Sequence, residues 1–298
     1  MSLLREAAGA IIAVGLATAI AVPKKLELYA AVAFGINWLV VLVHAIPRQS
    51  ETYFDLTGTM TFVAVTITAC AVHANTTHNA VALIRSFLAS GLVLLWSVRL
   101  GSFLFLRIHA TGTDDRFDAI KTRPVRFFSV WTLQGLWAFV TLLPTLLLHV
   151  SAAPAADALQ WTDVVGVLSW VIGFAIEVVA DGQKTAFRTE YKRSGKFISS
   201  GLWRYSRHPN YFGEILLWIG MTILCSGQLA TWSDVAIASL SPLLVTLLLT
   251  RMSGIPLLEH KADVKFGACP KYQQYKRSTN VLIPWFPSGP TINETTPL

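Results

Sequence analysis

The stretch that decides the fold is residues 163–181, DVVGVLSWVIGFAIEVVAD, an apolar run with one acid, Glu177, inside it. A helix needs about 20 apolar residues to cross a bilayer, so this run predicts a membrane span. Outward along the chain, similar runs alternate with short polar loops. The predicted spans are residues 7–22, 26–46, 58–72, 80–108, 127–150, 163–181, 211–229 and 234–250. We therefore expect an all-α, polytopic transmembrane helical bundle of about seven or eight spans, in one integral membrane domain covering residues 1–298.

The composition also indicates a membrane protein. Of the 298 residues, 53% are hydrophobic and 14% are charged, and the mean hydropathy is +0.53. A soluble domain has roughly 25% charged residues. The first run is short and follows only Arg5, which leaves a signal peptide as an alternative. Ala17-Thr18-Ala19 is a weak cleavage site and another span follows at once, so we expect a retained helix.

Several kinds of site are not expected. Cys70, Cys225 and Cys269 are far apart and lack C-x-x-C spacing, which favours neither a disulfide framework nor a zinc site. No two histidines have i, i+3 or i, i+4 spacing on one span, which argues against a metal or haem site. Neither G-x-G-x-x-G nor G-x-x-x-x-G-K-[ST] occurs. Any dinucleotide must therefore bind among the helices and their loops.

Lysine and arginine are distributed unevenly between the predicted loops. Neither residue occurs in loops 73–79, 151–162 and 226–233. The alternate segments are basic, with four in 109–126, seven in 182–210 and six in the tail from Arg251. The positive-inside rule places the basic segments in the cytoplasm, with Lys24-Lys25 as an exception. Topology and attraction to anionic lipid explain this charge, and charge alone favours that interpretation over a site for a phosphorylated ligand.

A stripe of charged residues gives a sharper indication of a functional site. Glu177, Asp181, Lys184 and Arg188 follow at i, i+4, i+7 and i+11, which places them on one face of a helix. An ionisable group inside an apolar span is costly and by default marks a functional site. The alternative is a helix end packed by ion pairs. Four charges running from the span into a basic loop favour a polar pocket.

The next motif is GLWRYSRHPNYFGE, residues 201–214. Pro209 suits the first turn of a helix, where its missing N–H costs nothing. The free backbone N–H groups there predict an anion site. Candidate binding side chains around it are Arg204, Arg207, His208, Asn210, Tyr211, Glu214 and Trp218. An ordinary basic cap explains the arginines but leaves the polar face of Asn210 and Glu214 unexplained.

Three further candidates interrupt the fourth predicted span, namely Trp96, Arg99 and Arg107. Arg99 lies well inside the apolar run and should need a carboxylate or phosphate partner. Arg107 is near the end of the run, where a long side chain can reach the interface. We include both arginines among the candidate cofactor-binding residues.

Four motifs in order resemble a known family. They are WSVRLGSFLFLR (96–107), GFAIEVVADGQKTAF (173–187), GLWRYSRHPNYFGEILLWIG (201–220) and SGIPLLEHKADVKFG (253–267). This pattern resembles the DUF1295 family, which belongs with the steroid 5-alpha-reductase C-terminal domains. The resemblance covers about residues 50–285, and the spans in 1–50 contribute little.

The resemblance implies a helical bundle that binds NADPH from the cytoplasmic side and passes a hydride to an enone C=C bond. The cofactor supplies the reducing chemistry and the protein positions it. Family cofactor positions map onto Asp181, Arg188, Asn210 and Glu214, and further onto Glu177, Lys184, Arg204, Arg207, His208, Trp218, His260 and Tyr272.

At the positions that hold the substrate in this family, the sequence departs from the family pattern. Steroid reductases hold the substrate ketone with a tyrosine and a glutamate. The tyrosine's counterpart here is Trp96, which donates a hydrogen bond but is no useful acid. Asp55 and Glu51 are the nearest candidates for the glutamate. These three are the candidate catalytic residues, and no steroid substrate is assigned.

Two alternatives stay open. R-H-P-x-Y-x-G also occurs in membrane methyltransferases such as the isoprenylcysteine carboxyl methyltransferases, which bind S-adenosylmethionine. Those proteins commonly have an Asn-Pro pair where this chain reads CSGQLATWSD, residues 225–234. The other alternative is a non-catalytic lipid-binding protein, for which neither cofactor should bind.

The favoured hypothesis is an NADPH-dependent membrane oxidoreductase that reduces a C=C bond of a lipid-like molecule. Its basic residues should favour NADPH over NADH. The expected partners are membrane lipid and an apolar small molecule, which enters from the bilayer among the first four spans, with no nucleic acid. We expect an endoplasmic reticulum membrane in a eukaryote, where Asn75-Thr-Thr is a possible glycosylation sequon, and the inner membrane in a bacterium.

Overall fold

The computed structural model describes residues 3–76, 79–111, 114–153, 158–191 and 196–288. Its α-helices are α1 Leu3–Lys24, α2 Glu27–Val40, α3 Ile46–Arg48, α4 Phe54–Thr76, α5 Ala80–Thr111, α6 Pro124–Thr141, α7 Leu143–Val150, α8 Trp161–Glu190, α9 Pro209–Ser226, α10 Trp232–Ala238, α11 Leu240–Leu247, α12 Ile255–Phe266 and α13 Pro270–Ser278. Within these ranges the regular elements are all helical, which confirms the predicted fold class.

Six described helices are long and apolar enough to cross a membrane, or up to seven if the bent pair α6 and α7 is one span. That pair bends by 55°. Pro144 lies in the first turn of α7, where it cannot donate the N–H that would continue α6. The predicted span 211–229 corresponds to α9, whose polar beginning, with Asn210 and Glu214, lowers its hydropathy. The described spans are those of an integral membrane protein.

The chain forms two compact units. Unit 1 comprises residues 1–163 and 224–241, and unit 2 comprises residues 164–223 and 242–298. The expectation of a single domain stays a prediction.

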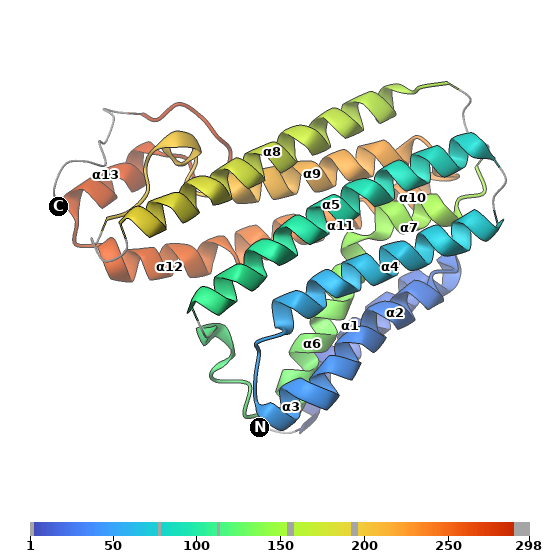
Figure 1. Cartoon of the computed structure of the whole chain (residues 1–298), viewed down its shortest axis with the longest axis horizontal. Helices are drawn as coiled ribbons and strands as arrows, with labels where there is room; N and C mark the ends of the chain where they lie inside the picture. Colours follow the sequence, from blue (N-terminus) through green and yellow to red (C-terminus); the bar gives the residue numbers. More distant parts are fainter. Residues whose placement is uncertain (1–2, 77–78, 112–113, 154–157, 192–195, 289–298) are drawn as a thin grey trace. The chain divides into compact units, whose positions relative to one another are not determined.

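Unit 1 is a bundle in which α6 packs against α1 and α2, while α4 packs against α2 and α5 (Figure 1). Its core contains Trp131, Phe127 and Phe117. Two ion pairs link distant segments, at 3.0 Å between Arg85 and Asp163 and at 2.7 Å between Lys24 and Asp234. Lys24, an exception to the predicted charge pattern, therefore has an acidic partner.

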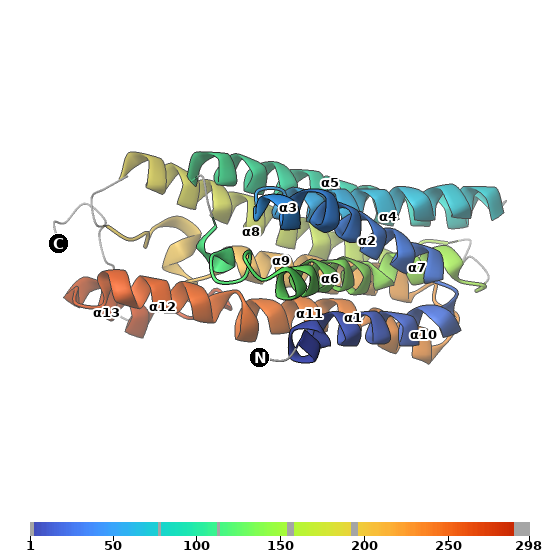
Figure 2. The same cartoon turned by 90° about the horizontal axis from the view of Figure 1, so that it is seen from below.

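In unit 2, α8 and α9 pack backbone to backbone at glycines. A Cβ on Gly173 would come within 2.6 Å of the Gly213 carbonyl oxygen, and a Cβ on Gly220 within 2.6 Å of the Trp170 nitrogen. Small residues at such contacts are typical of helix pairs in membranes. Beyond α9, the last helix α13 folds back beside the end of α12 (Figures 1 and 2). The seam between α8 and α9 fixes where the polar residues of both helices meet.

Candidate functional site

The loop before α9 is held on α8 by three features. The Leu202 N–H donates to Gln183 Oε1 at 2.9 Å, and the Trp203 indole N–H donates to the Ala180 carbonyl at 3.0 Å. Gly201 has a φ of +58°, and a Cβ there would lie 2.5 Å from Gln183 Nε2. Glycine is therefore required at this turn. The GLWR segment thus carries Arg207 and His208 to a defined place beside α8.

The chain after α12 holds the same loop from the other side. The Arg207 N–H donates to the Asn280 carbonyl at 2.9 Å, and the Trp285 N–H donates to the Tyr205 carbonyl at 2.9 Å. On α13, the Tyr275 hydroxyl donates to the Trp203 carbonyl at 2.6 Å. Backbone pairing of this kind leaves the side chains of the loop available for other contacts.

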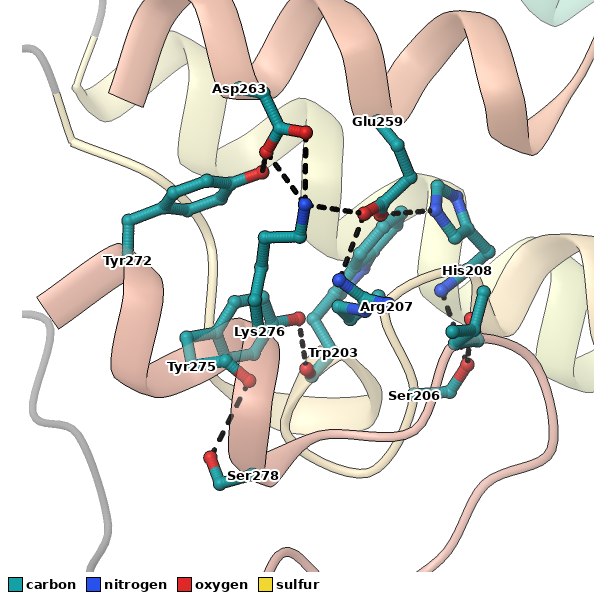
Figure 3. A network of polar contacts seen from close by, with 11 residues as sticks. Trp203, Ser206, Arg207, His208, Glu259, Asp263, Tyr272, Tyr275, Lys276 and Ser278 are labelled. Atoms are coloured by element: carbon teal, nitrogen blue, oxygen red, sulfur yellow. Dashed lines mark hydrogen bonds and ion pairs between the residues drawn. The ribbon is translucent and has the colours of Figure 1, made fainter. Parts of the chain in front are cut away.

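Glu259 on α12 is the hub of the polar network (Figure 3). Its carboxylate accepts from Arg207 Nη1 at 2.8 Å and lies 2.9 Å from His208 Nε2. It also lies 3.4 Å from Lys276 Nζ on α13. A carboxylate that accepts from several cations and N–H groups fixes their positions through charge-assisted hydrogen bonds.

A second acid completes this network (Figure 3). Asp263, one turn beyond Glu259, accepts from Lys276 Nζ at 2.7 Å and from the Tyr272 hydroxyl at 3.1 Å. Burial raises the pKa of Tyr272, and the hydrogen bond to Asp263 raises it further. Tyr272 therefore keeps its proton at neutral pH and acts as a hydrogen-bond donor.

His208 is buried at the end of the loop. Burial lowers the pKa of His208, and the hydrogen bond to Glu259 opposes this shift only in part. The imidazole is therefore neutral at pH 7, and it stacks on Tyr211 with ring centroids 5.6 Å apart. Because a carboxylate only accepts, a neutral His208 donates its Nε2 proton to Glu259.

A cavity of about 310 Å³ opens on this network. Its cationic lining residues are Lys184, Arg188, Lys196, Arg207, Lys261 and Lys265. Its aromatic lining residues are Phe187, Phe197, Trp203, Phe266, Tyr272 and Tyr275, and His208 and Glu259 also contribute. This lining is chemically suited to an anionic ligand that also carries a flat ring.

The predicted charge stripe lies on α8 as expected from its spacing. Glu177 and Asp181 are buried. Asp181 Oδ1 accepts from the Asn210 side-chain amide at 3.1 Å, which joins α8 to α9. Lys184 Nζ lies 4.5 Å from the Trp203 ring centroid, and Arg188 is the last stripe residue in the cavity lining. The stripe therefore runs from a helix–helix contact to the cavity.

The other predicted residues of unit 2 lie outside the lining of this cavity. Arg204 is exposed, with its guanidinium 5.9 Å from the Tyr205 ring centroid. Trp218 is fully buried, Glu214 is half-buried on α9, and His260 is exposed on α12. Their assignment to cofactor binding stays a prediction.

The candidate catalytic residues all belong to unit 1. Asp55 and Trp96 line one small cavity of about 40 Å³. Glu51 lies elsewhere, where its carboxylate accepts from the Asp114 N–H at 3.2 Å. Thus the structure brings together two of the three.

Of the two candidate arginines on α5, the structure describes the side chain of one. The Arg99 guanidinium lies 5.6 Å from the Phe103 ring centroid. The side chain of Arg107 lies outside the described part of the chain, as does Thr77 of the Asn75 sequon.

Sequence reasoning missed the acids and several cations of this site. Glu259, Asp263 and Lys276 were not among the candidates, nor were the lining lysines 261 and 265. One signal was available, because Glu259 and Asp263 lie at i, i+4 on α12 as Tyr272 and Lys276 do on α13.

The fold and this site define a helical integral membrane protein with a basic, aromatic-lined cavity. The family described as "Protein of unknown function (DUF1295)" matches residues 38–279. The chain therefore belongs to this steroid 5-alpha-reductase-like family, which confirms the resemblance.

One curated relative is informative. Over 146 residues the chain is 34% identical to the Delta(14)-sterol reductase ERG24 of Saccharomyces cerevisiae. The match covers 45% of this chain and 30% of the yeast protein, so the chain matches less than a third of that relative's length. No solved structure matches the chain.

Proposed function

We propose that this protein is a membrane oxidoreductase that reduces a C=C bond of a sterol-like apolar molecule, with NADPH as the hydride donor. The family and the similarity to a sterol reductase support the reaction class. The observation that carries the cofactor assignment is the cavity of unit 2, with its six cations and six aromatic rings.

The cavity's donor set fits NADPH. Three phosphate groups need cations, and guanidinium and ammonium groups bind phosphate through charge-assisted hydrogen bonds. S-adenosylmethionine carries a sulfonium cation and no phosphate, so the same lining disfavours it. This difference favours the reductase over the methyltransferase hypothesis.

Within this proposal the residues have distinct tasks. NADPH, when bound, supplies the hydride. Lys184 and Arg188 bind its phosphates, and the rings of Phe197 and Trp203 offer flat surfaces for a base. Glu259 orients Arg207 and His208 through the contacts described above. Asp181 and Asn210 position α9 against α8.

The orientation and compartment follow from the same proposal. NADPH binding requires unit 2 to face the cytoplasm, as the positive-inside rule also predicts. The sterol-like substrate belongs to the bilayer and is expected to enter unit 1 laterally. An endoplasmic reticulum membrane is the expected compartment in a eukaryote.

The test is calorimetric titration of the detergent-purified protein with NADPH, NADH and S-adenosylmethionine. We expect micromolar NADPH binding, weaker NADH binding and no S-adenosylmethionine binding. Lys184→Gln should weaken NADPH binding about tenfold, a typical loss for one charge-assisted hydrogen bond. Arg251→Gln is the matched control, because Arg251 is exposed and lies outside the cavity lining.

Each other outcome contradicts part of the proposal. Equal NADPH and NADH affinities would remove the role assigned to the extra phosphate. Binding of S-adenosylmethionine alone would favour a methyltransferase. If none of the three ligands binds, a non-catalytic lipid-binding protein would be favoured.

A further inference from the structure

The small cavity of unit 1 combines apolar walls with a few polar groups. It lies among residues of α4, α5 and α6 and measures about 40 Å³. Its lining residues are Asp55, Thr59, Phe62, Trp96, Ser97, Leu100, Leu104, Gln134 and Trp137. This volume accommodates one polar group and a few waters, not a whole lipid molecule.

Gln134 is a lining residue of this cavity and carries a buried hydrogen-bond acceptor. Its side chain is buried on α6, with 6% of the residue exposed. The Gln134 Nε2 group donates to the Phe54 carbonyl at 2.9 Å. A backbone carbonyl only accepts, so this contact fixes the amide with its nitrogen toward Phe54. Among the described residues, Gln134 Oε1 then has no hydrogen-bond partner, although it is buried.

The hydroxyl groups of the lining do not supply the missing proton. The Thr59 hydroxyl donates to the Asp55 carbonyl at 3.2 Å, and the Ser97 hydroxyl donates to the Val93 carbonyl at 2.7 Å. The carboxylate of Asp55 is a further acceptor. Apart from the indole N–H groups of Trp96 and Trp137, the polar side chains of the lining thus present acceptors. A buried acceptor of this kind requires a donor.

We propose that this cavity is a hydroxyl-binding site, in which the terminal alcohol of an apolar ligand donates its proton to Gln134 Oε1. Phe62, Leu100 and Leu104 provide apolar surface for the carbon skeleton next to that alcohol. This inference rests on the proposed function and deepens it, because it makes the substrate a hydroxylated sterol-like lipid. A ketone has no proton to donate and so would leave Gln134 Oε1 without a donor.

The experiment uses the full-length protein in detergent with the fluorescent sterol dehydroergosterol bound. Competitors are cholesterol, its 3-ketone cholest-4-en-3-one and its 3-methyl ether. We expect cholesterol to displace the probe at about tenfold lower concentration than the ketone or the ether, because one hydrogen bond is lost in each of these. Equal displacement by all three would overturn the proposal and assign the Gln134 acceptor to water.

Two variants of the cavity sharpen the test. Gln134→Met keeps the length of the side chain but removes the acceptor, so the preference for the alcohol should disappear. Thr59→Val is the matched control. It removes a hydroxyl group from the same lining, but that hydroxyl already donates its proton to the Asp55 backbone carbonyl. Should Gln134→Met fail to fold, the order of the three competitors on the unmodified protein decides the question.

Parallel NADPH titration separates this inference from the proposed function. NADPH binding without a preference for the alcohol would overturn the hydroxyl site alone. A preference for the alcohol without NADPH binding would overturn the reductase proposal alone, and the cavity would then be a lipid-binding site.

Discussion

The Asn210 side-chain amide donates a 3.1 Å hydrogen bond to Asp181 Oδ1, which joins the first turn of α9 to the charged stripe of α8. Asp181 is buried. This contact lies two residues from His208, and so it couples the packing of the two helices to the position of the polar network.

Asn210→Ala should weaken NADPH binding about tenfold while the helix content stays unchanged. The change leaves the buried Asp181 carboxylate without this donor, which costs about 1–3 kcal/mol, and loosens the helix start that carries His208. Calorimetry and circular dichroism measure the two quantities. Thr189→Ala, an exposed substitution on α8, is the control. Loss of folding with unchanged NADPH affinity per folded molecule would show a purely structural contact.

Glu259→Gln should lower both thermal stability and NADPH affinity. It removes the charge that Arg207 and Lys276 share, and like charges then lie close together in a half-buried site. We expect a loss of about 1–3 kcal/mol in unfolding free energy, measured by thermal melting in detergent. Glu190→Gln makes the same charge change at the exposed end of α8 and should have little effect. Equal effects of both variants would refute the hub role of Glu259.

The sequence predicted well those features of the structure that depend on residue spacing within one helix. The charged stripe of α8 and the start of α9 at Pro209 follow from spacing within one helix, which a single sequence displays. The network around Glu259 depends instead on α12 and α13 folding against a loop some 50 residues earlier in the chain. Residue periodicity contains no such pairing, and so Glu259 was missed.

Two further features show the same limit. Gln134 is a polar residue within an apolar run, but only the contact with Phe54 shows that its amide oxygen lacks a protein donor. The 55° bend between α6 and α7 falls within one continuous apolar stretch of sequence. Pro144 was the residue that could have indicated it.

Gly213→Ala should destabilise the protein by about 1–3 kcal/mol, since overpacking of a tight contact has that magnitude. The new Cβ would lie 2.5 Å from the Gly173 carbonyl oxygen and 2.7 Å from the Glu177 nitrogen, so the backbones must separate. Gly182→Ala is a matched control on α8, because a Cβ there meets nothing within 4 Å. Alanine also has the higher helix propensity, so the control should be neutral or stabilising. Thermal melting of both variants distinguishes close packing from propensity; a stabilised Gly213→Ala would show that α8 and α9 are not in contact.

The stability of the protein should decrease as the pH falls below about 6.5, in part because of His208. The unfolded chain takes up a proton at this residue near the ordinary pKa of about 6.5. In the folded protein burial holds the pKa of His208 lower, despite the hydrogen bond to Glu259, with Lys184 and Arg207 adding repulsion. Between the two values the unfolded chain binds more protons, so acidification favours unfolding.

His208→Gln keeps an amide donor toward Glu259 but does not titrate. Its melting temperature should therefore fall less between pH 7.5 and pH 5.5, and the difference should correspond to the uptake of about one proton on unfolding. His260→Gln, an exposed substitution on α12, should keep the slope of the unmodified protein. Identical slopes in all three proteins would place the acid sensitivity elsewhere and remove the argument that His208 is neutral in the folded site.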